Sequence, residues 1–227
     1  MANAGKSPAD GHRRRLRERF LRAGLEGLQD YEALELLLTY AIPRCDVKPV
    51  AKQLLERFGS IEKVLDAPPG DLLECAGLGP AAVTLVVLLK QLCSKYLEQK
   101  ARDVDVLDST SRVVDFLRMK LGGGRKETCM VLFLNSQNHL IAYETYPGTV
   151  DRASIYAREV AEKALLCRAC GVILAHNHPS GVCEPSPADL HLTRKLKAAL
   201  ELLTIELYDH IIVTPSAFRS LRAYGLV

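Results

Sequence analysis

Two short apolar runs constrain the fold of this chain more than any other feature. Residues 128–134 read Thr-Cys-Met-Val-Leu-Phe-Leu, and residues 171–175 read Gly-Val-Ile-Leu-Ala. A run of this length without polar alternation is typical of a strand buried on both faces, which requires helices on each side of its sheet. Helical patterns at about 154–167 and 186–203 alternate with these runs. Strands that alternate with helices predict an α/β or α+β catalytic domain in the second half of the chain.

Weaker patterns complete this domain. Asn135 to Asn138 has the composition of a hairpin turn between the first apolar run and a partner strand. The further elements predicted here are a helix at 109–120, a strand at 139–146, a strand at 207–213 and a helical turn beginning at Pro215 and Ser216.

The first hundred residues have a different texture, in which nearly every segment is a short helix. Asp30 and Ser60 precede two of these segments as predicted N-caps, and Gly59 follows another as a C-cap. The predicted helices are 31–40, 47–58, 61–66, 71–75 and 81–95. The fold class is thus α+β, with an all-helical module at 1–100, of which about 1–12 is expected to be disordered, followed by the α/β domain at 101–227.

Composition indicates a soluble, cytoplasmic protein without membrane contact. The longest apolar run, Val83 to Leu89, ends at Lys90, well short of the roughly 20 residues that cross a bilayer, and the N-terminus has no secretory layout. The seven cysteines are expected to be reduced, with Cys167 and Cys170 as packing residues rather than a redox pair.

The net charge of +3 gives little guidance about partners, because most charges are evenly distributed. One basic cluster stands out, opposed only by Glu18. Its members are Arg13, Arg14, Arg15, Arg17, Arg19 and Arg22. Such a cluster is either a solvated helix face or a set of phosphate contacts.

The strongest chemical motif follows the second apolar run. His176 and His178 are two apart, so in an extended chain their side chains project from the same side. Pro179 favours the end of a strand, and a loop containing Gly181 leads to a helix start where Asp189 can face the same point. Two imidazoles and one carboxylate are ligands suited to Zn²⁺.

This ligand set predicts a catalytic rather than a structural zinc site. Three protein ligands leave a fourth position for water, whose pKa zinc lowers to about 7. Cys183 is an alternative fourth ligand that would close the site, and the residues could also be two surface histidines beside a capping aspartate. The combined spacing of His176, His178 and Asp189 favours the catalytic zinc site.

The whole motif resembles the JAMM (MPN+) metalloprotease family: His-x-His, seven residues, Ser186, two residues, Asp189. The wider pattern resembles the bacterial RadC branch of that family. The resembling segments are His176–Gly181, Pro185–Ser186, Asp209–Val213, Gly148–Asp151 and Arg158–Glu159. This resemblance implies an α/β JAB/MPN-like domain at 101–227, with a mixed sheet flanked by helices. It also implies Zn²⁺ as cofactor and hydrolysis of a peptide or isopeptide bond.

The resemblance also implies two catalytic residues. A glutamate preceding the first core strand acts as general base and acid in this family, and Glu127 fits that position. Hydrolysis independently needs a carboxylate that accepts a proton and returns it to a leaving amine. Glu144, Glu159 and Glu162 remain alternatives, Glu159 foremost.

By resemblance, Ser186 helps to hold the oxyanion of the tetrahedral intermediate, and it is also a candidate helix N-cap. Asp209 and His210 are adjacent in a predicted strand, so at most one of them faces the zinc site. That residue is interpreted as a hydrogen-bond partner of a ligand.

The helical module contains a second motif. Gly77-Leu78-Gly79, between a short and a long helix, resembles the hairpin of a helix–hairpin–helix module, whose glycines let the backbone approach a DNA phosphate. Residues 28–34 follow the usual RadC pattern only in part, and 41–45 replaces its Gly-rich turn. The module is equally compatible with binding a protein or with a structural role.

Three functions follow as hypotheses. The first is a zinc hydrolase acting on a protein or peptide, with zinc-bound water as nucleophile and Glu127 as proton shuttle. The second is a DNA-associated, repair-related protein whose helical module binds DNA and whose zinc site acts on nucleic acid or is not catalytic. The third, a non-catalytic scaffold, is disfavoured because all three ligands are present.

Overall fold

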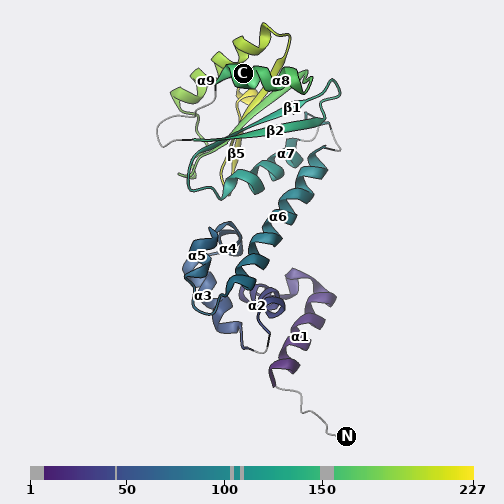
Figure 1. Cartoon of the computed structure of the whole chain (residues 1–227), viewed down its shortest axis with the longest axis vertical. Helices are drawn as coiled ribbons and strands as arrows, with labels where there is room; N and C mark the ends of the chain where they lie inside the picture. Colours follow the sequence, from purple (N-terminus) through teal and green to yellow (C-terminus); the bar gives the residue numbers. More distant parts are fainter. Residues whose placement is uncertain (1–7, 44, 103–104, 108–109, 149–155) are drawn as a thin grey trace. The chain divides into compact units, whose positions relative to one another are not determined.

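The computed structural model describes residues 8–43, 45–102, 105–107, 110–148 and 156–227 (Figure 1). The chain forms two compact units, Met1–Leu92 and Cys93–Val227. Their division falls inside one long helix, whereas the sequence pattern placed the domain boundary at residue 100. The first unit is helical and the second contains the sheet, which confirms the predicted α+β class.

The first unit is built from short helices joined by tight turns. Gly59 ends α3 in the left-handed conformation, with φ of 90°, and the Ser60 hydroxyl accepts a hydrogen bond from the Lys63 N–H at the start of α4. Both residues act as predicted. The helices are α1 (Pro8–Ala23), α2 (Asp30–Ala41), α3 (Lys48–Phe58), α4 (Ile61–Asp66), α5 (Pro69–Leu73) and α6 (Pro80–Arg102), with a 3₁₀ turn at Leu25–Gly27.

Two predictions for this unit were wrong. Helix α2 is capped by Gln29 rather than by Asp30, because the Glu32 carboxylate accepts the Gln29 N–H at 2.9 Å and draws Asp30 into the first turn. Helix α1 already begins at Pro8, so residues 8–12 are helical rather than disordered. Residues 1–7 lie outside the described part of the chain.

Large aliphatic side chains from α2 to α6 form the core of this unit. Leu38, Leu54, Leu72 and Val86 are fully buried, and each such side chain contributes roughly 1.5–3 kcal/mol of transfer free energy. By length and composition alone, α6 is also the one described helix that could cross a membrane. That evidence is weak, because core helices of soluble proteins pass the same test and Val86 packs in this core.

The second unit is a five-stranded sheet with helices on both faces. The strand order is β2-β1-β3-β4-β5, in which β3 and β4 are parallel and the other neighbours antiparallel. This is the predicted mixed sheet. The elements are α7 (Thr110–Leu117), a π-helical turn (Arg118–Gly122), β1 (Thr128–Leu134), β2 (Leu140–Pro147), α8 (Ala157–Leu166), β3 (Gly171–Asn177), α9 (Pro187–Glu201), β4 (Glu206–Val213), β5 (Phe218–Ser220) and a 3₁₀ turn (Arg222–Tyr224).

The two apolar runs are buried on both faces of the sheet. Alternate residues of β1, including Val131 and Phe133, pack with α8 and α9, whereas Met130 and Leu132 pack with α7. Figure 1 shows α8 and α9 on one side of the sheet and α7 on the other. The metal motif therefore leaves the sheet on the face that α9 covers.

Two elements differ from the sequence prediction at the end of the sheet. The segment from Pro215 forms no helical turn, because Thr214 and Ala217 close a hairpin through their backbones and the Thr214 hydroxyl, and β5 then pairs with the edge of β4. Strand β3 continues through His176 and Asn177 instead of ending at Ala175. Ser109 and Ser154, which were predicted to begin helices, lie outside the described residues.

The glycines of the α5–α6 hairpin have unequal structural roles, which predicts unequal effects of substitution. Gly77 has φ of 85°, and a Cβ there would meet Val50 Cγ2 at 2.8 Å, whereas a Cβ at Gly79 would meet nothing within 4 Å. Gly77→Ala should lower the free energy of unfolding by roughly 1–2 kcal/mol, with Gly79→Ala as a near-neutral control. Urea unfolding of the full chain measures both, and equal losses would contradict the prediction.

Candidate metal centre

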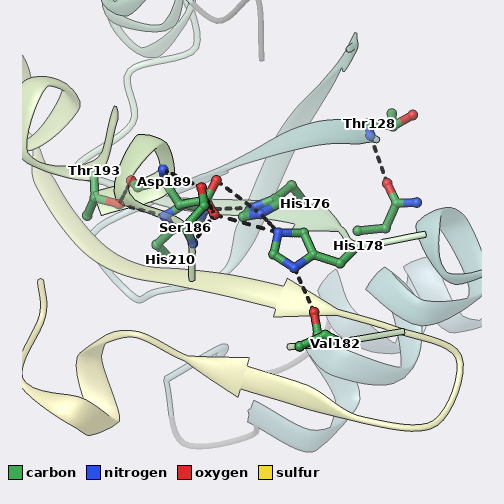
Figure 2. A network of polar contacts seen from close by, with 9 residues as sticks. Thr128, His176, His178, Val182, Ser186, Asp189, Thr193 and His210 are labelled. Atoms are coloured by element: carbon green, nitrogen blue, oxygen red, sulfur yellow. Dashed lines mark hydrogen bonds and ion pairs between the residues drawn. The ribbon is translucent and has the colours of Figure 1, made fainter. Parts of the chain in front are cut away.

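Three side chains predicted as ligands converge where β3 meets α9 (Figure 2). His176 is the penultimate residue of β3, His178 follows the strand, and Asp189 lies in the first turn of α9. Their ligand atoms all lie within 4.8 Å of one another. Among the described residues, this is the only His, Cys, Asp and Glu group that could hold a metal ion.

The ligand separations are near those around a tetrahedral ion, except that the two histidine nitrogens lie closer to each other than such an ion would hold them. The two histidine Nε2 atoms are 2.8 Å apart, His176 Nε2 lies 3.3 Å from Asp189 Oδ1, and His178 Nε2 lies 3.6 Å from Asp189 Oδ2. Ligands about 2.0–2.1 Å from zinc are about 3.3 Å from one another. His176 is buried and His178 half-buried, so the centre is enclosed but reachable from the His178 side.

The loop after β3 orients the His178 ring. Its backbone N–H continues the β3–β4 ladder by donating to the Val213 carbonyl at 3.1 Å. Its Nδ1 lies 2.7 Å from the Val182 carbonyl, which can only accept, so Nδ1 carries the proton. Gly181, with φ of 81°, lets the loop turn back to make this contact. The Nε2 lone pair is therefore directed at the centre.

The His176 ring is oriented from inside the protein. Its Nδ1 lies 2.8 Å from Nε2 of His210, and Nδ1 of His210 lies 2.6 Å from the Thr193 hydroxyl of α9. Burial, followed by repulsion from His176, lowers the pKa of His210 to about 3, so this ring is neutral. Of the adjacent residues Asp209 and His210, it is His210 that faces the triad.

Asp189 has two structural partners besides the histidines. Its carboxylate accepts hydrogen bonds from the backbone N–H and the hydroxyl of Ser186, both at 2.7 Å, and the Ser186 hydroxyl accepts the Asp189 N–H at 3.2 Å. This reciprocal capping box starts α9. Burial raises the pKa of the Asp189 carboxyl, but the interactions with His176 and Ser186 outweigh burial and lower it below its ordinary value. Asp189 is thus an anion held ready at the centre.

Glu127 lies just before β1, two residues from Cys129, which pairs with His176 across β1 and β3. Alternate residues of an extended chain share a face, so we expect the Glu127 side chain on the face of His176. Burial, and then the charges of Glu127 and Asp189, raise the pKa of the Cys129 thiol to about 12. Both carboxylates thus act on this one thiol.

The alternative glutamates have other environments. Glu144 on β2 forms an ion pair with Lys163 at 2.5 Å. Glu159 and Glu162 are exposed on α8. The alternative fourth ligand, Cys183, has its thiol 3.6 Å from the Thr214 hydroxyl and does not belong to the metal-binding group.

Asn177 is a functional candidate that the sequence analysis missed. Its side chain is buried, accepts the Thr128 N–H at 2.7 Å, and donates to the carbonyls of Gly124 and Lys126, both at 3.2 Å. These bonds fix the backbone on both sides of Glu127. The sequence did carry a signal for Asn177, because it is a polar residue between His176 and His178 at the end of an apolar strand.

Comparison with known proteins identifies the family of this chain. A model of the RadC-like JAB domain matches residues 107–226, and a model of the UPF0758 N-terminal region matches residues 11–84. The chain belongs to the RadC family. A UPF0758 protein of Ruegeria pomeroyi is 40% identical over 215 residues, covering 94% of this chain and 96% of the relative. A UPF0758 protein of Rhodobacter capsulatus is 41% identical over 213 residues, covering 93% and 100%.

Membership of the RadC family gives the second unit a metalloprotease-like JAB fold. Of the RadC-like segment Gly148–Asp151, only Gly148 is among the described residues. Its N–H donates to the Glu127 carbonyl at 3.0 Å, and a Cβ at this position would collide with that carbonyl oxygen. Gly148 thus holds the Glu127 backbone from β2, opposite the contacts that Asn177 makes.

Asp209 belongs to the other face of the RadC sheet. It accepts hydrogen bonds from the Ser220 hydroxyl at 2.6 Å and the Arg222 N–H at 3.0 Å, and so ties β4 to β5 and the turn after it. Burial, the largest influence, raises the pKa of the Asp209 carboxyl. A cavity of about 800 Å³ opens beside it, and the sheet separates this cavity from the triad.

In the N-terminal unit, Gly77 and Gly79 are exposed on either side of buried Leu78. The hairpin leads into α6, whose first residue is Pro80, and the Gly79 carbonyl accepts the N–H groups of Ala82 and Val83. DNA binding by Gly77 and Gly79 stays a prediction.

The geometry predicts that the purified chain binds about one zinc ion, with His178→Ala and Asp189→Ala abolishing tight binding because each removes one of three protein ligands. His191→Ala is the matched control, since His191 is an exposed histidine on the same helix as Asp189. Elemental analysis after dialysis measures retention. A parent without retained zinc, or an equal loss in His191→Ala, would refute the assignment.

Proposed function

We propose that this RadC-family chain is a zinc-dependent hydrolase of a peptide or isopeptide bond. The observation that carries the proposal is the convergence of three ligand side chains, with Glu127 two residues before the strand partner of His176. Three ligands leave a coordination position for the reaction, and two neutral imidazoles with one carboxylate leave the centre with a net positive charge. This combination supports hydrolysis better than a structural zinc role.

In such a reaction, different residues of the chain transfer protons and hold the proton-transferring residue in place. Zinc, when bound, supplies a Lewis acid that acidifies water and polarises a carbonyl. Glu127 accepts the proton of the attacking water and delivers it to the leaving nitrogen, so that the amine departs neutral. The backbone contacts made by Asn177 and Gly148 hold Glu127 in place for both transfers.

The proposed role of Ser186 requires a change of partner. Its single hydroxyl proton is donated to Asp189 in the capping box, so donation to an oxyanion requires the hydroxyl to rotate away from that carboxylate. The backbone N–H of Ser186 also donates to Asp189, so α9 keeps part of its cap during this rotation.

Replacing the proposed proton shuttle separates catalysis from metal binding. Glu127→Gln should retain zinc but lose roughly 10²–10⁴-fold in hydrolysis, because the amide cannot accept the water proton. The measurement is turnover of a panel of peptide and isopeptide substrates by zinc-loaded parent and variant. Glu159→Gln tests the alternative base: loss of activity in that variant, with Glu127→Gln active, would transfer the role to Glu159.

A second candidate function is DNA association through the N-terminal unit. It is favoured by the exposed glycines of the α5–α6 hairpin and by four exposed arginines of α1. These are Arg14, Arg15, Arg17 and Arg22. Three arginines of the basic cluster have partners within the unit: Arg13 donates to the carbonyls of Ile42 and Cys45, Arg19 pairs with Glu32, and exposed Arg14 pairs with Glu18.

A charge placed at the hairpin tests this candidate function. Gly79→Glu should weaken binding of a short DNA duplex, because a carboxylate would oppose the phosphate, whereas Gln53→Glu adds the same charge at an exposed position of α3 and should have little effect. Fluorescence anisotropy at several salt concentrations measures both. Parent affinity that does not fall with salt, or equal effects of the two variants, would exclude phosphate contact at the hairpin.

A further inference from the structure

The hydrogen bonds around His210 form a chain that begins and ends at metal ligands. Asp189 and Thr193 are one turn apart on α9, and the Thr193 hydroxyl lies 2.6 Å from the backbone carbonyl of Asp189. The same hydroxyl lies 2.6 Å from Nδ1 of His210, whose Nε2 faces Nδ1 of His176 at 2.8 Å. Thr193 and His210 are both buried, and Figure 2 shows them to the left of His176 and His178.

The positions of the protons in this series of hydrogen bonds follow from the Asp189 backbone carbonyl at its start. A carbonyl oxygen only accepts, so the single proton of the Thr193 hydroxyl is donated to Asp189. Thr193 must then accept from His210, which places a proton on Nδ1 of His210. The hydrogen-bond partners of His210 are a hydroxyl and an imidazole, so a charge on this buried ring would have no hydrogen-bonded counter-ion. The neutral ring with its proton on Nδ1 accepts at Nε2.

His176 completes the chain. Its Nδ1 must donate to Nε2 of His210, which leaves the lone pair of a neutral His176 on Nε2. The Val182 carbonyl imposes the same arrangement on His178. Two lone pairs then face each other across 2.8 Å, an arrangement that is favourable only with a cation between them.

We propose that Thr193 and His210 are positioning residues that keep Nε2 of His176 unprotonated and free to bind the metal. Through them, the backbone carbonyl of Asp189 sets the tautomer of His176. The proposal rests on the proposed zinc centre and adds to it two residues that do not touch the ion. Removing the Thr193 hydroxyl frees His210 to move its proton to Nε2. His210 would then donate to His176 Nδ1 and drive the His176 proton onto Nε2, where it blocks coordination.

Two substitutions at one position test this relay in the full chain. Thr193→Val keeps the shape and loses the hydroxyl, whereas Thr193→Ser keeps the hydroxyl and loses a methyl group. Thr193→Val should bind zinc roughly 10–100-fold more weakly than the parent, and Thr193→Ser should stay close to it. Competition with a chelating zinc indicator measures the affinities, and thermal unfolding without zinc reports whether the variants fold.

The outcomes separate the relay from the zinc centre itself. A parent that binds no zinc would overturn the proposed function and the relay together. A parent that binds zinc while Thr193→Val binds equally well would overturn the relay and leave the centre intact. A loss as large in Thr193→Ser as in Thr193→Val would assign the effect to packing and also overturn the relay.

The tautomer can be observed without any variant, which covers the case in which Thr193→Val does not fold. In zinc-loaded parent labelled with ¹⁵N-histidine, long-range proton–nitrogen spectra distinguish a protonated nitrogen from a metal-bound one. His176 should show a protonated Nδ1 and a metal-bound Nε2. Coordination through Nδ1 would overturn the proposal.

Discussion

The parallel pairing of β3 with β4 is the interaction on which the proposed metal centre depends. In this register Leu174 lies beside His210 and His176 beside Ile212, so the ring of His210 reaches back to His176 on the face covered by α9. The ladder continues past β3, where the His178 N–H bonds to Val213. A slip of one residue would turn His210 to the opposite face and remove the partner of His176. The sheet register and the ligand geometry are therefore one constraint.

Buried polar groups make that register specific. An unpaired buried polar group costs about 1–3 kcal/mol, so alternative packings that separate these partners are disfavoured. In the second unit each such side chain near the centre has a partner: His176 with His210, Asn177 with the segment before β1, Thr193 with Asp189, and Asp209 with Ser220. These polar contacts are all made only in the observed register, whereas the apolar core alone would permit several registers.

Sequence patterns predicted much of this architecture because its dominant signals are local. The apolar run at 128–134 matches β1 residue for residue, and the caps at Gly59 and Ser60 follow from backbone geometry. The turn at Pro215 was mispredicted because β5 exists only by pairing with the edge of β4, a long-range contact that leaves no periodic trace. Thr193 and Asn177 were missed for the same reason, since each is recognised only by groups that the fold brings to it.

Strand β3 serves both faces of the sheet, and this divides the proposed chemistry. His176 and His178 project toward α9, while Asn177 between them reaches the segment that carries Glu127. Three consecutive residues at the end of β3 thus supply two proposed ligands and the contacts that fix the segment carrying the proposed base. Asp189, the third proposed ligand, is held at the start of α9 by its capping box with Ser186. Because each proposed ligand is held by contacts that also stabilise the fold, the proposed centre would lose little conformational entropy on binding an ion.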